Sequence, residues 1–296
     1  MDNKVVKWHL PGFCYNFYLN QIVINLMKEY KNSFRDGYVP GSVYGTFPGA
    51  IWNGGRAVFG ISSKKDIQAI LKTYERFNVP VRFTWTNPFI EGTKVYDTYC
   101  NLIMDLANNG KNEVLVNSLE LEDYIRKTYP GFAVISSTTK RITDMEQLKK
   151  EFDKDYKLVV LDYDLNKDEK VLGALEPYAD RVEILVDEIC YSSCEKRRQH
   201  YEDEARAQME FDKGTTFNCP NKKTPPSFSE CMKRPSFISN EEIDKYIERG
   251  FTNFKLVGRG LPKEMVIESY LYYLVKDDER EFIKGRIDKE LRKIGK

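Results

Sequence analysis

Histidine is scarce in this chain, which has only His9 and His200, and no serine stands in a Gly-x-Ser-x-Gly context. A catalytic triad of serine, histidine and aspartate needs a histidine as its base, so such a triad would have to use one of these two. A cysteine nucleophile with a histidine base could be built from Cys190 or Cys194 with His200. The scarcity of histidine therefore disfavours triad hydrolysis and leaves a cysteine–histidine pair as an alternative.

An excess of charge of one sign is also lacking. Lysine and arginine number 46 against 45 acidic residues, a net charge of +1, which predicts no long-range attraction to RNA or to an anionic membrane. No apolar run approaches the roughly 18 residues of a membrane helix, and the first residues carry no apolar stretch followed by a small-residue cleavage site. We therefore expect a cytoplasmic protein without a membrane span, whose six cysteines are thiols or metal ligands rather than disulfides.

The sequence does contain a regular alternation of strand and helix patterns. Eight short, largely apolar runs are each followed by a helical pattern; the runs span 5–10, 41–47, 81–86, 113–118, 132–138, 157–165, 181–188 and 253–260. Alternating strands and helices predict a parallel sheet, and eight such units favour a closed α/β barrel, the (β/α)8 TIM-like fold. We expect one barrel domain over 1–276 and a charged C-terminal helix over 277–296. A further short run at 235–239 is a candidate ninth strand.

Four cysteines have a spacing that suggests a shared metal centre. Cys190 and Cys194 follow the seventh predicted strand, and Cys219 and Cys231 lie in an irregular segment with four prolines over 211–236. If the first two cysteines occupy a helical turn, they share a face, so both sulfurs can reach one ion. A loop of this length without secondary structure is uncommon in a compact domain. A metal would tie it down at the C-terminal face of the barrel, where barrel enzymes build their active sites.

The identity of the metal stays open at this point. Four thiolates suit a [4Fe–4S] cluster or a tetrahedral zinc, and the presence of only one closely spaced pair favours the cluster. His200 could replace one cysteine in a zinc site, and Cys14, after the first strand, is a substitute ligand. Unrelated free thiols or two oxidised pairs are the alternatives. Cys100 lies on an apolar helix face, where we expect a buried thiol.

Polar residues at the predicted carboxyl ends of strands indicate a pocket at the barrel mouth. Arg259 follows the last strand, where a buried guanidinium needs an acid or a ligand, and Asp187 and Glu188 are the candidate acids. We expect these three residues to hold an anionic or carbonyl-containing substrate. The glycine-rich stretch 48–60, with Arg56, is a second candidate for anion binding. Further polar strand ends are His9, Asn87, Asn117, Ser136 and Asp162.

Four stretches resemble the collagenase-like peptidase family, known as unclassified peptidase family thirty-two, and its relatives in ubiquinone and RNA hydroxylation. They are FAVISSTTKRITD, KLVVLDYDLNKDE, VEILVDEICYSSC and ISNEEIDKYIERGFTNFKLVGRGLPKEMV. The similarity covers roughly residues 110–275, and its specific parts are the sequence Lys255-Leu256-Val257-Gly258-Arg259 and the cysteines behind Val186. The resemblance implies a TIM-like barrel, a four-cysteine iron–sulfur cluster in many members and oxygen-independent hydroxylation in some.

The chain also departs from the family. Where the family has Gly-Ala-Leu-Cys, this chain reads Asp187-Glu188-Ile189-Cys190, and its cysteine spacing differs. Our leading hypothesis is an iron–sulfur barrel protein that catalyses oxygen-independent hydroxylation or a related modification. Its [4Fe–4S] cluster would be held by Cys190, Cys194, Cys219 and Cys231, beside Arg259, Asp187 and Glu188. The alternatives are a metal-stapled binding barrel without catalysis and a peptidase. A small-molecule or RNA substrate, a partner protein of the same family and a redox partner all stay open.

Overall fold

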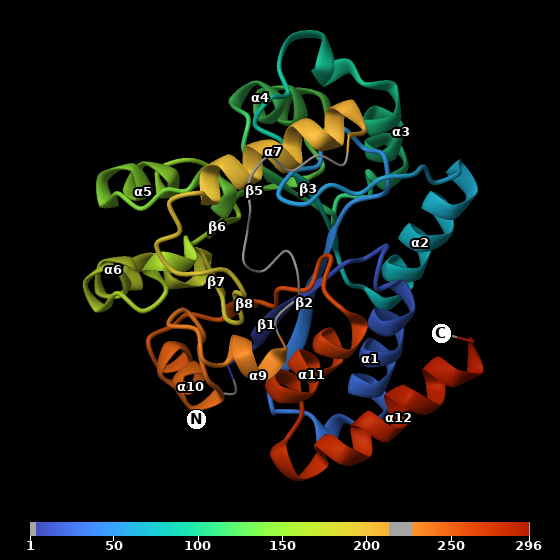
Figure 1. Cartoon of the computed structure of the whole chain (residues 1–296), viewed down its shortest axis with the longest axis vertical. Helices are drawn as coiled ribbons and strands as arrows, with labels where there is room; N and C mark the ends of the chain where they lie inside the picture. The colour runs from blue at the N-terminus through green and yellow to red at the C-terminus, as the bar shows by residue number, and fades with distance from the viewer. Residues whose placement is uncertain (1–3, 213–226, 296) are drawn as a thin grey trace.

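Eight parallel strands close into a barrel in the computed structural model, which describes residues 4–212 and 227–295. The strands are β1 (Val6–Pro11), β2 (Tyr38–Gly45), β3 (Val81–Trp85), β4 (Glu113–Val116), β5 (Ala133–Ser136), β6 (Leu158–Val160), β7 (Val182–Leu185) and β8 (Asn253–Lys255). Each strand pairs with the next along the chain, and β8 pairs with β1. The predicted (β/α)8 TIM-like barrel is therefore confirmed (Figure 1).

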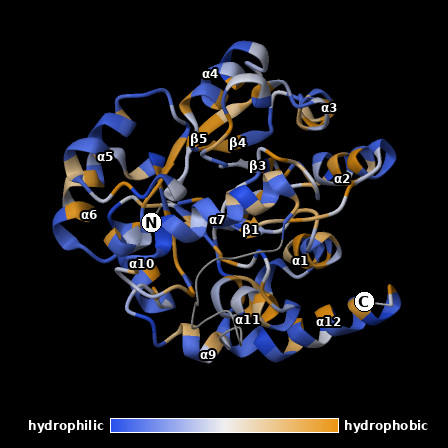
Figure 2. Ribbon diagram, turned by 45° about the horizontal axis from the view of Figure 1, so that its top comes forward, coloured by the Kyte–Doolittle hydropathy of each residue, from blue (hydrophilic) through white to orange (hydrophobic). Residues whose placement is uncertain are grey.

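Helices surround the barrel, and the hydrophobic colour of Figure 2 concentrates on the strands that they cover. The α-helices are α1 (Phe17–Glu29), α2 (Lys64–Phe77), α3 (Thr98–Ala107), α4 (Leu119–Thr128), α5 (Met145–Phe152), α6 (Glu169–Leu175), α7 (Arg197–Glu210), α9 (Phe228–Cys231), α10 (Asn240–Glu248), α11 (Lys263–Leu274) and α12 (Arg280–Lys293). Short 3-10 helices are η1 (Lys31–Ser33), η2 (Gly92–Tyr96), η3 (Thr138–Lys140), η4 (Tyr163–Leu165), η5 (Glu176–Arg181) and η6 (Asp277–Glu279). None of the helices in the described ranges combines the length and the hydropathy that a membrane span requires.

Serine caps fix where several of these helices begin. The Oγ atoms of Ser63, Ser118 and Ser239 accept hydrogen bonds from backbone amides in the first turns of α2, α4 and α10. Such caps satisfy amides that have no partner within the helix. Ser118 comes two residues after the end of β4, so α4 begins almost directly after the strand and the connection at the barrel mouth is short.

The alternation of side chains along each strand divides the apolar residues between two regions. In β3, Val81, Phe83 and Trp85 face outward and join the large core between the strands and the helices. The inward positions carry a much smaller apolar cluster, formed by Leu115, Ile135, Leu158, Val160 and Leu185. The apolar side of the barrel interior thus comes from β4 to β7, and the rest of the interior is polar.

An interior ion cluster of Arg82, Glu113, Glu183 and Lys255 fills the polar side. Arg82 Nε donates to Glu113 Oε2 at 2.7 Å, and its Nη1 donates to Glu183 Oε2. Lys255 Nζ lies 3.4 Å from the other oxygen of Glu183. Burial raises the pKa of Glu183, but the charges of Arg82 and Lys255 and the hydrogen bond from Arg82 outweigh it and lower this pKa to about 2. The cluster therefore keeps its carboxylates ionised inside the barrel.

His9 lies beside this cluster and not at the mouth. Its Nδ1 is hydrogen-bonded to Ser42 Oγ at 2.9 Å, and the side chain is 1% exposed. Burial, followed by the charge of Arg82, lowers the pKa of His9 to about 3 against the opposing effect of Glu183. The imidazole is therefore neutral at neutral pH.

The predicted ninth strand at 235–239 is wrong. This segment forms a turn, closed by a hydrogen bond from the Phe237 amide to the Arg234 carbonyl at 3.0 Å. The Ile238 amide donates to the Val186 carbonyl at 2.9 Å, which ties the turn to the end of β7 without adding a strand. Pro235 lacks the amide hydrogen that a ladder needs, and the barrel is already closed.

The charged C-terminal segment forms α12, whose one face is buried. Ile283, Ile287 and Leu291, four residues apart, lie in the main core. The helix runs alongside α1 (Figure 1), and Arg286 Nη2 lies 3.6 Å from Glu29 Oε1. The sequence pattern predicted a charged helix, and the packing against α1 adds a buried stripe to it.

Replacing Arg82 by methionine removes the cation that Glu113 and Glu183 share. We expect R82M to lower the free energy of unfolding by about 3–5 kcal/mol, because a buried charge that loses its partner is costly. Urea unfolding followed by circular dichroism measures this loss. The double variant R82M/E113Q keeps the pair between Glu183 and Lys255 and should recover part of it. Equal stability of R82M and the wild type would contradict the role assigned to the interior ion cluster.

Candidate active site at the barrel mouth

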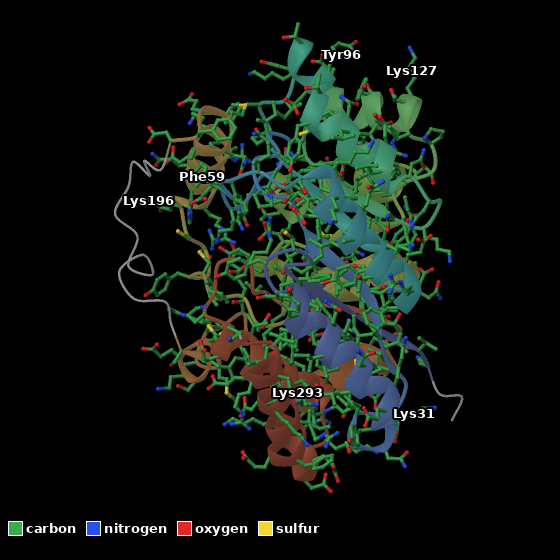
Figure 3. All side chains as sticks on the ribbon, turned by 90° about the vertical axis from the view of Figure 1, so that its right-hand side faces the viewer. Lys31, Phe59, Tyr96, Lys127, Lys196 and Lys293 are labelled. Carbon is green, nitrogen blue, oxygen red and sulfur yellow. The ribbon has the colours of Figure 1, made fainter. Side chains whose placement is uncertain are left out.

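A pocket opens at the carboxyl ends of the strands. It is small, with a cavity volume of about 80 Å³, and its lining comes from β2, β3, β4, β7, β8, α7 and the loops after β2 and β5. Figure 3 shows this end of the barrel from the side: Lys196, in the segment after β7, and Phe59, in the loop after β2, lie on the opposite side of the molecule from Lys31, which precedes β2. Active sites of (β/α)8 barrels are built at this end, so the pocket is the candidate active site.

Arg259 reaches the pocket from the segment after β8. Its Nη1 donates to Thr84 Oγ1 at 2.9 Å and to Asn53 Oδ1 at 3.2 Å, and its Nη2 donates to the Gly54 carbonyl at 3.3 Å. All three acceptors are neutral, and no carboxylate of the described residues forms an ion pair with the guanidinium. Burial, and to a lesser degree the charge of Arg56, lowers the pKa of Arg259 from its ordinary value. This arginine is thus positioned for an anionic ligand.

Asp187 was one of the two acids expected to pair with Arg259, and that pairing is wrong. Its Oδ1 accepts from the Val257 amide and its Oδ2 from Ser269 Oγ, both at 2.7 Å. The carboxyl group therefore joins the end of β7 to the segment after β8 and to α11. Burial raises the pKa of Asp187 to about 7. Its position makes it a structural link rather than a group that faces the substrate.

Glu188, the second acid, lines the pocket but pairs with Arg197. The distance from Glu188 Oε2 to Arg197 Nη2 is 3.1 Å, and the other carboxylate oxygen accepts from the Cys190 amide at 2.9 Å. The Arg197 guanidinium lies 4.5 Å from the ring centre of Tyr201 and 5.2 Å from that of Tyr163. Glu188 therefore fixes α7 against the barrel mouth, and its charge is already compensated.

Lys255 is a pocket residue that the sequence analysis did not assign to the site. Its ammonium nitrogen lies 4.3 Å from the ring centre of Tyr44, and Arg259 Cζ lies 5.9 Å from the same ring. Burial lowers the pKa of Lys255 to about 8, opposed by Glu183 and assisted by Arg82. The two-residue period of a strand could have predicted this position. Phe254 and Leu256 face the outer core, so the alternating residues 255, 257 and 259 face the barrel interior.

The glycine-rich loop after β2 contributes Arg56 to the pocket, and α7 holds the loop in place. The Ala57 amide donates to Glu204 Oε2 at 2.7 Å, and Arg56 Nη1 lies 3.4 Å from His200 Nε2. A Cβ at Gly54 would lie 2.5 Å from the backbone of Thr86, so only glycine permits this approach. The close approach presents the Gly54 carbonyl to Arg259.

The other polar strand-end residues are engaged in local hydrogen bonds. Asn87 Nδ2 donates to the Ile51 and Ala205 carbonyls, Asn117 Nδ2 to Thr139 Oγ1, and Ser136 Oγ to Glu151, while Asp162 accepts from Arg141. These bonds hold the loops and α7 at the mouth. None of these four residues lines the pocket, although Thr139 does.

Three of the four predicted cysteine ligands lie around the end of β7. Cys190 and Cys194 follow that strand, and Cys231, at the end of α9, donates from Sγ to the Asp187 carbonyl at 3.2 Å. The helical turn expected for the first pair is wrong, because Ser193 has a left-handed φ of 54° and α7 begins only at Arg197. Cys219 lies outside the described residues.

The described cysteines do not by themselves form a metal site. Within residues 4–212 and 227–295, no group of three or more histidine, cysteine, aspartate or glutamate side chains could hold a metal ion. Burial raises the pKa values of Cys190 and Cys231, which favours thiols over the thiolates that metals need. The residues present thus do not fit a cluster in this arrangement, and the four-cysteine centre stays a prediction.

The remaining cysteine and histidine candidates lie elsewhere. Cys100 is buried in α3, as expected, and Cys14 is partly buried beside the main core, where burial raises its pKa to about 11. His200 lies on α7, between Arg56 and Glu204. All cysteines within the described ranges are free, so no oxidised pair exists among them.

No protein-family model and no curated protein matches the chain. Among solved structures, the U32 peptidase Mk0906 aligns with 87% of this chain and 94% of its own, at 12% identity and a TM-score of 0.56. The barrel has the fold of a U32 peptidase. At this identity the likeness concerns the fold alone, and there it agrees with the resemblance seen in the sequence.

Replacing Arg197 by methionine tests how the mouth is held together. R197M leaves Glu188 buried without its ion partner, so we expect the free energy of unfolding to fall by about 3–5 kcal/mol. R197K keeps the charge but loses the planar stacking on two tyrosine rings, and should lose less. Urea unfolding of both is compared with R198M, a change at an exposed position of the same helix that should stay within about 0.5 kcal/mol of the wild type. A loss no larger for R197M than for R198M would refute this role.

Proposed function

We propose that this protein is an enzyme whose barrel mouth binds an anionic substrate. The observation that carries the proposal is the Arg259 guanidinium, which lines the pocket and has only neutral acceptors among the described residues. A half-buried guanidinium that has no carboxylate partner is costly unless a ligand compensates it. Its planar array of donors suits a carboxylate or a phosphate.

The charges around Arg259 support the same conclusion. Four cationic side chains line the pocket, from Arg56, Arg197, Lys255 and Arg259, against one lining carboxylate, Glu188. That carboxylate is paired with Arg197, and Lys255 lies 3.4 Å from Glu183, so the positive charge left in the lining comes from Arg56 and Arg259, although the net charge of the chain is only +1. The hydroxyls of Thr86 and Thr138, two further lining residues, have no hydrogen-bond partner among the described residues. A polar, anionic ligand would satisfy both features.

Oxygen-independent hydroxylation with an iron–sulfur cluster is our proposal for the chemistry. The resemblance of the cysteine-bearing segment after β7 to a family with iron–sulfur members supports it, together with the contact of Cys231 with the Asp187 carbonyl near the same strand end. The described cysteines form no metal site as they stand, so metal binding would have to rearrange them. A cluster, when bound, would supply one-electron transfer. The residues of the pocket would bind and orient the substrate through Arg259 and Arg56.

The two alternatives predict different behaviour. The solved neighbour is named a peptidase, but no histidine is among the described residues that line this pocket, so a serine or cysteine nucleophile there has no imidazole base. A metal-stapled barrel without catalysis would bind the metal without needing a substrate pocket. The excess of positive charge around Arg259 favours the enzyme.

Anion binding depends on Arg259 in this proposal. Inorganic phosphate, titrated at constant ionic strength, should raise the melting temperature of the wild type, because it binds the folded state only. In R259Q we expect an affinity lower by about tenfold or more, which corresponds to at least about 1.4 kcal/mol. Calorimetric titration gives the affinity directly.

The matched control for this experiment is R249Q, which removes an arginine on the outer surface that pairs with Glu169 and Glu176. It should bind phosphate as the wild type does. If R259Q does not fold by circular dichroism, R259K takes its place, since it keeps the charge and loses the planar donors. Unchanged phosphate affinity in the folded Arg259 variant rejects the proposed anion site.

Anaerobic purification tests the metal prediction. We expect about four irons and about four sulfides per chain, as in a [4Fe–4S] cluster. Serine in place of Cys190, Cys194, Cys219 and Cys231 should abolish iron binding, whereas C100S should leave it unchanged. One zinc per chain would favour the zinc alternative. Protein without metal, or a quadruple variant with unchanged metal content, would show that the ligand set is wrong.

A further inference from the structure

We propose that Lys255 is a nucleophile that forms an imine with a carbonyl group of the substrate, while Arg259 holds the anionic group of the same molecule. This inference rests on the anion site proposed above and names its substrate class, an oxo acid or another carbonyl compound with an anionic group. The proposal depends on where these two side chains lie in the pocket.

Lys255 is placed at the inner end of the pocket by β8. The residue lies inside the barrel and is 6% exposed, and it is also one of the residues that line the open mouth. Its Nζ packs against the ring of Tyr44, and the Arg259 guanidinium lies farther out against the same ring. A ligand held by Arg259 therefore extends toward the lysine along one wall of the pocket.

The ion pair of Lys255 is loose in comparison with its neighbours. Its Nζ lies 3.4 Å from Glu183 Oε1, whereas Arg82 Nε lies 2.7 Å from Glu113 Oε2. Glu183 is also held directly by Arg82, so its charge stays compensated when the lysine loses a proton. The interior ion cluster thus fixes the position of the amine without requiring it to be charged.

The environment favours the reactive form of the amine. With a pKa of about 8, because of burial and the charges of Arg82 and Arg259, a fraction of Lys255 is neutral near neutral pH. Lysines in water have a pKa of about 10.4 and are almost fully protonated there. Desolvation beside another cation is an established way to activate a lysine for Schiff-base chemistry.

The proposed step is a condensation without any change of oxidation state. The neutral amine of Lys255 adds to the carbonyl carbon, the carbon–oxygen π bond breaks, and a proton passes from the nitrogen to the oxygen to give a hydroxyl group. That hydroxyl takes up a second proton from solvent and leaves as water, while the nitrogen lone pair forms the carbon–nitrogen double bond. The protonated imine then carries the positive charge that the ammonium ion carried, so the balance with Glu183 is restored.

Reductive trapping of the wild-type protein tests this step. The protein is incubated with sodium cyanoborohydride, which reduces an imine to a stable amine, together with pyruvate, levulinate or acetone as the carbonyl probe. The two oxo acids differ in the spacing between carbonyl and carboxylate, and acetone lacks the carboxylate. Peptide mapping by mass spectrometry then locates the adducts.

We expect one of the two oxo acids to label Lys255 about tenfold faster than acetone does, and much faster than it labels the exposed Lys64. The rate should rise with pH through about 8, as the neutral amine becomes the dominant form. K255R, which keeps the cation, should carry no adduct at this position while its circular dichroism stays that of the wild type. Inorganic phosphate should slow the labelling by an oxo acid.

The outcomes separate this inference from the proposed anion site. If Lys255 stays unlabelled by every probe, or is labelled no faster than Lys64, the imine proposal is overturned, even where phosphate binding depends on Arg259. If all three probes label Lys255 equally and R259Q changes nothing, the lysine is a nucleophile but the anion site is rejected. Fast labelling by an oxo acid that falls to the acetone rate in R259Q supports both.

Discussion

Glu183 is the residue on which the interior of this barrel depends, because a single buried carboxylate interacts with two cations from other strands. Arg82 reaches it from β3, and Lys255 reaches it from the neighbouring β8. Charges inside a protein persist only where their partners compensate the loss of hydration. The pairing therefore fixes the relative positions of β3, β7 and β8, a constraint that apolar contacts of similar volume would not impose.

The same carboxylate connects the stability of the barrel to its mouth. Along β8 and the segment after it, residues 253, 255, 257 and 259 all face inward, so the strand carries Lys255 at the level of the ion cluster and Arg259 at the level of the pocket. Arg259 lies outside the interior ion cluster, and its guanidinium donates to neutral oxygens of Asn53, Gly54 and Thr84. Among the described residues no carboxylate pairs with its guanidinium, which is the basis for the proposed anion site at the mouth.

The sequence predicted the architecture well because each strand and helix has a local signal. Eight apolar runs with helical patterns between them were sufficient for the barrel, and the position of Arg259 after the last strand was sufficient to place it at the mouth. Partnerships were not predictable in this way. The sequence predicts Asp187 and Glu188 as the acids for Arg259, but Ser269 and Arg197 engage them instead. Ser269 lies on α11 and Arg197 on α7, and the packing of these helices has no signature in the strand sequences. The pairing of Arg82 with Glu183 joins residues 101 positions apart, and nothing local indicates it.

The spacing of the cysteines in the sequence predicts less than the strand and helix patterns do. Their order along the chain predicts that Cys190, Cys194, Cys219 and Cys231 meet at one end of the barrel, but a spacing says nothing about where each sulfur points, and the described cysteines form no metal site. The thiol of Cys231 donates a hydrogen bond to the Asp187 carbonyl. A metal bound by this sulfur would require the thiol to lose its proton and the sulfur to turn away from that oxygen. The proposed anion site needs no such rearrangement, because Arg259 already lines the pocket and no carboxylate of residues 4–212 or 227–295 pairs with it. The proposed binding of an anionic substrate therefore does not depend on a metal. The proposed redox chemistry does, because metal binding would have to rearrange the cysteine sulfurs near the end of β7.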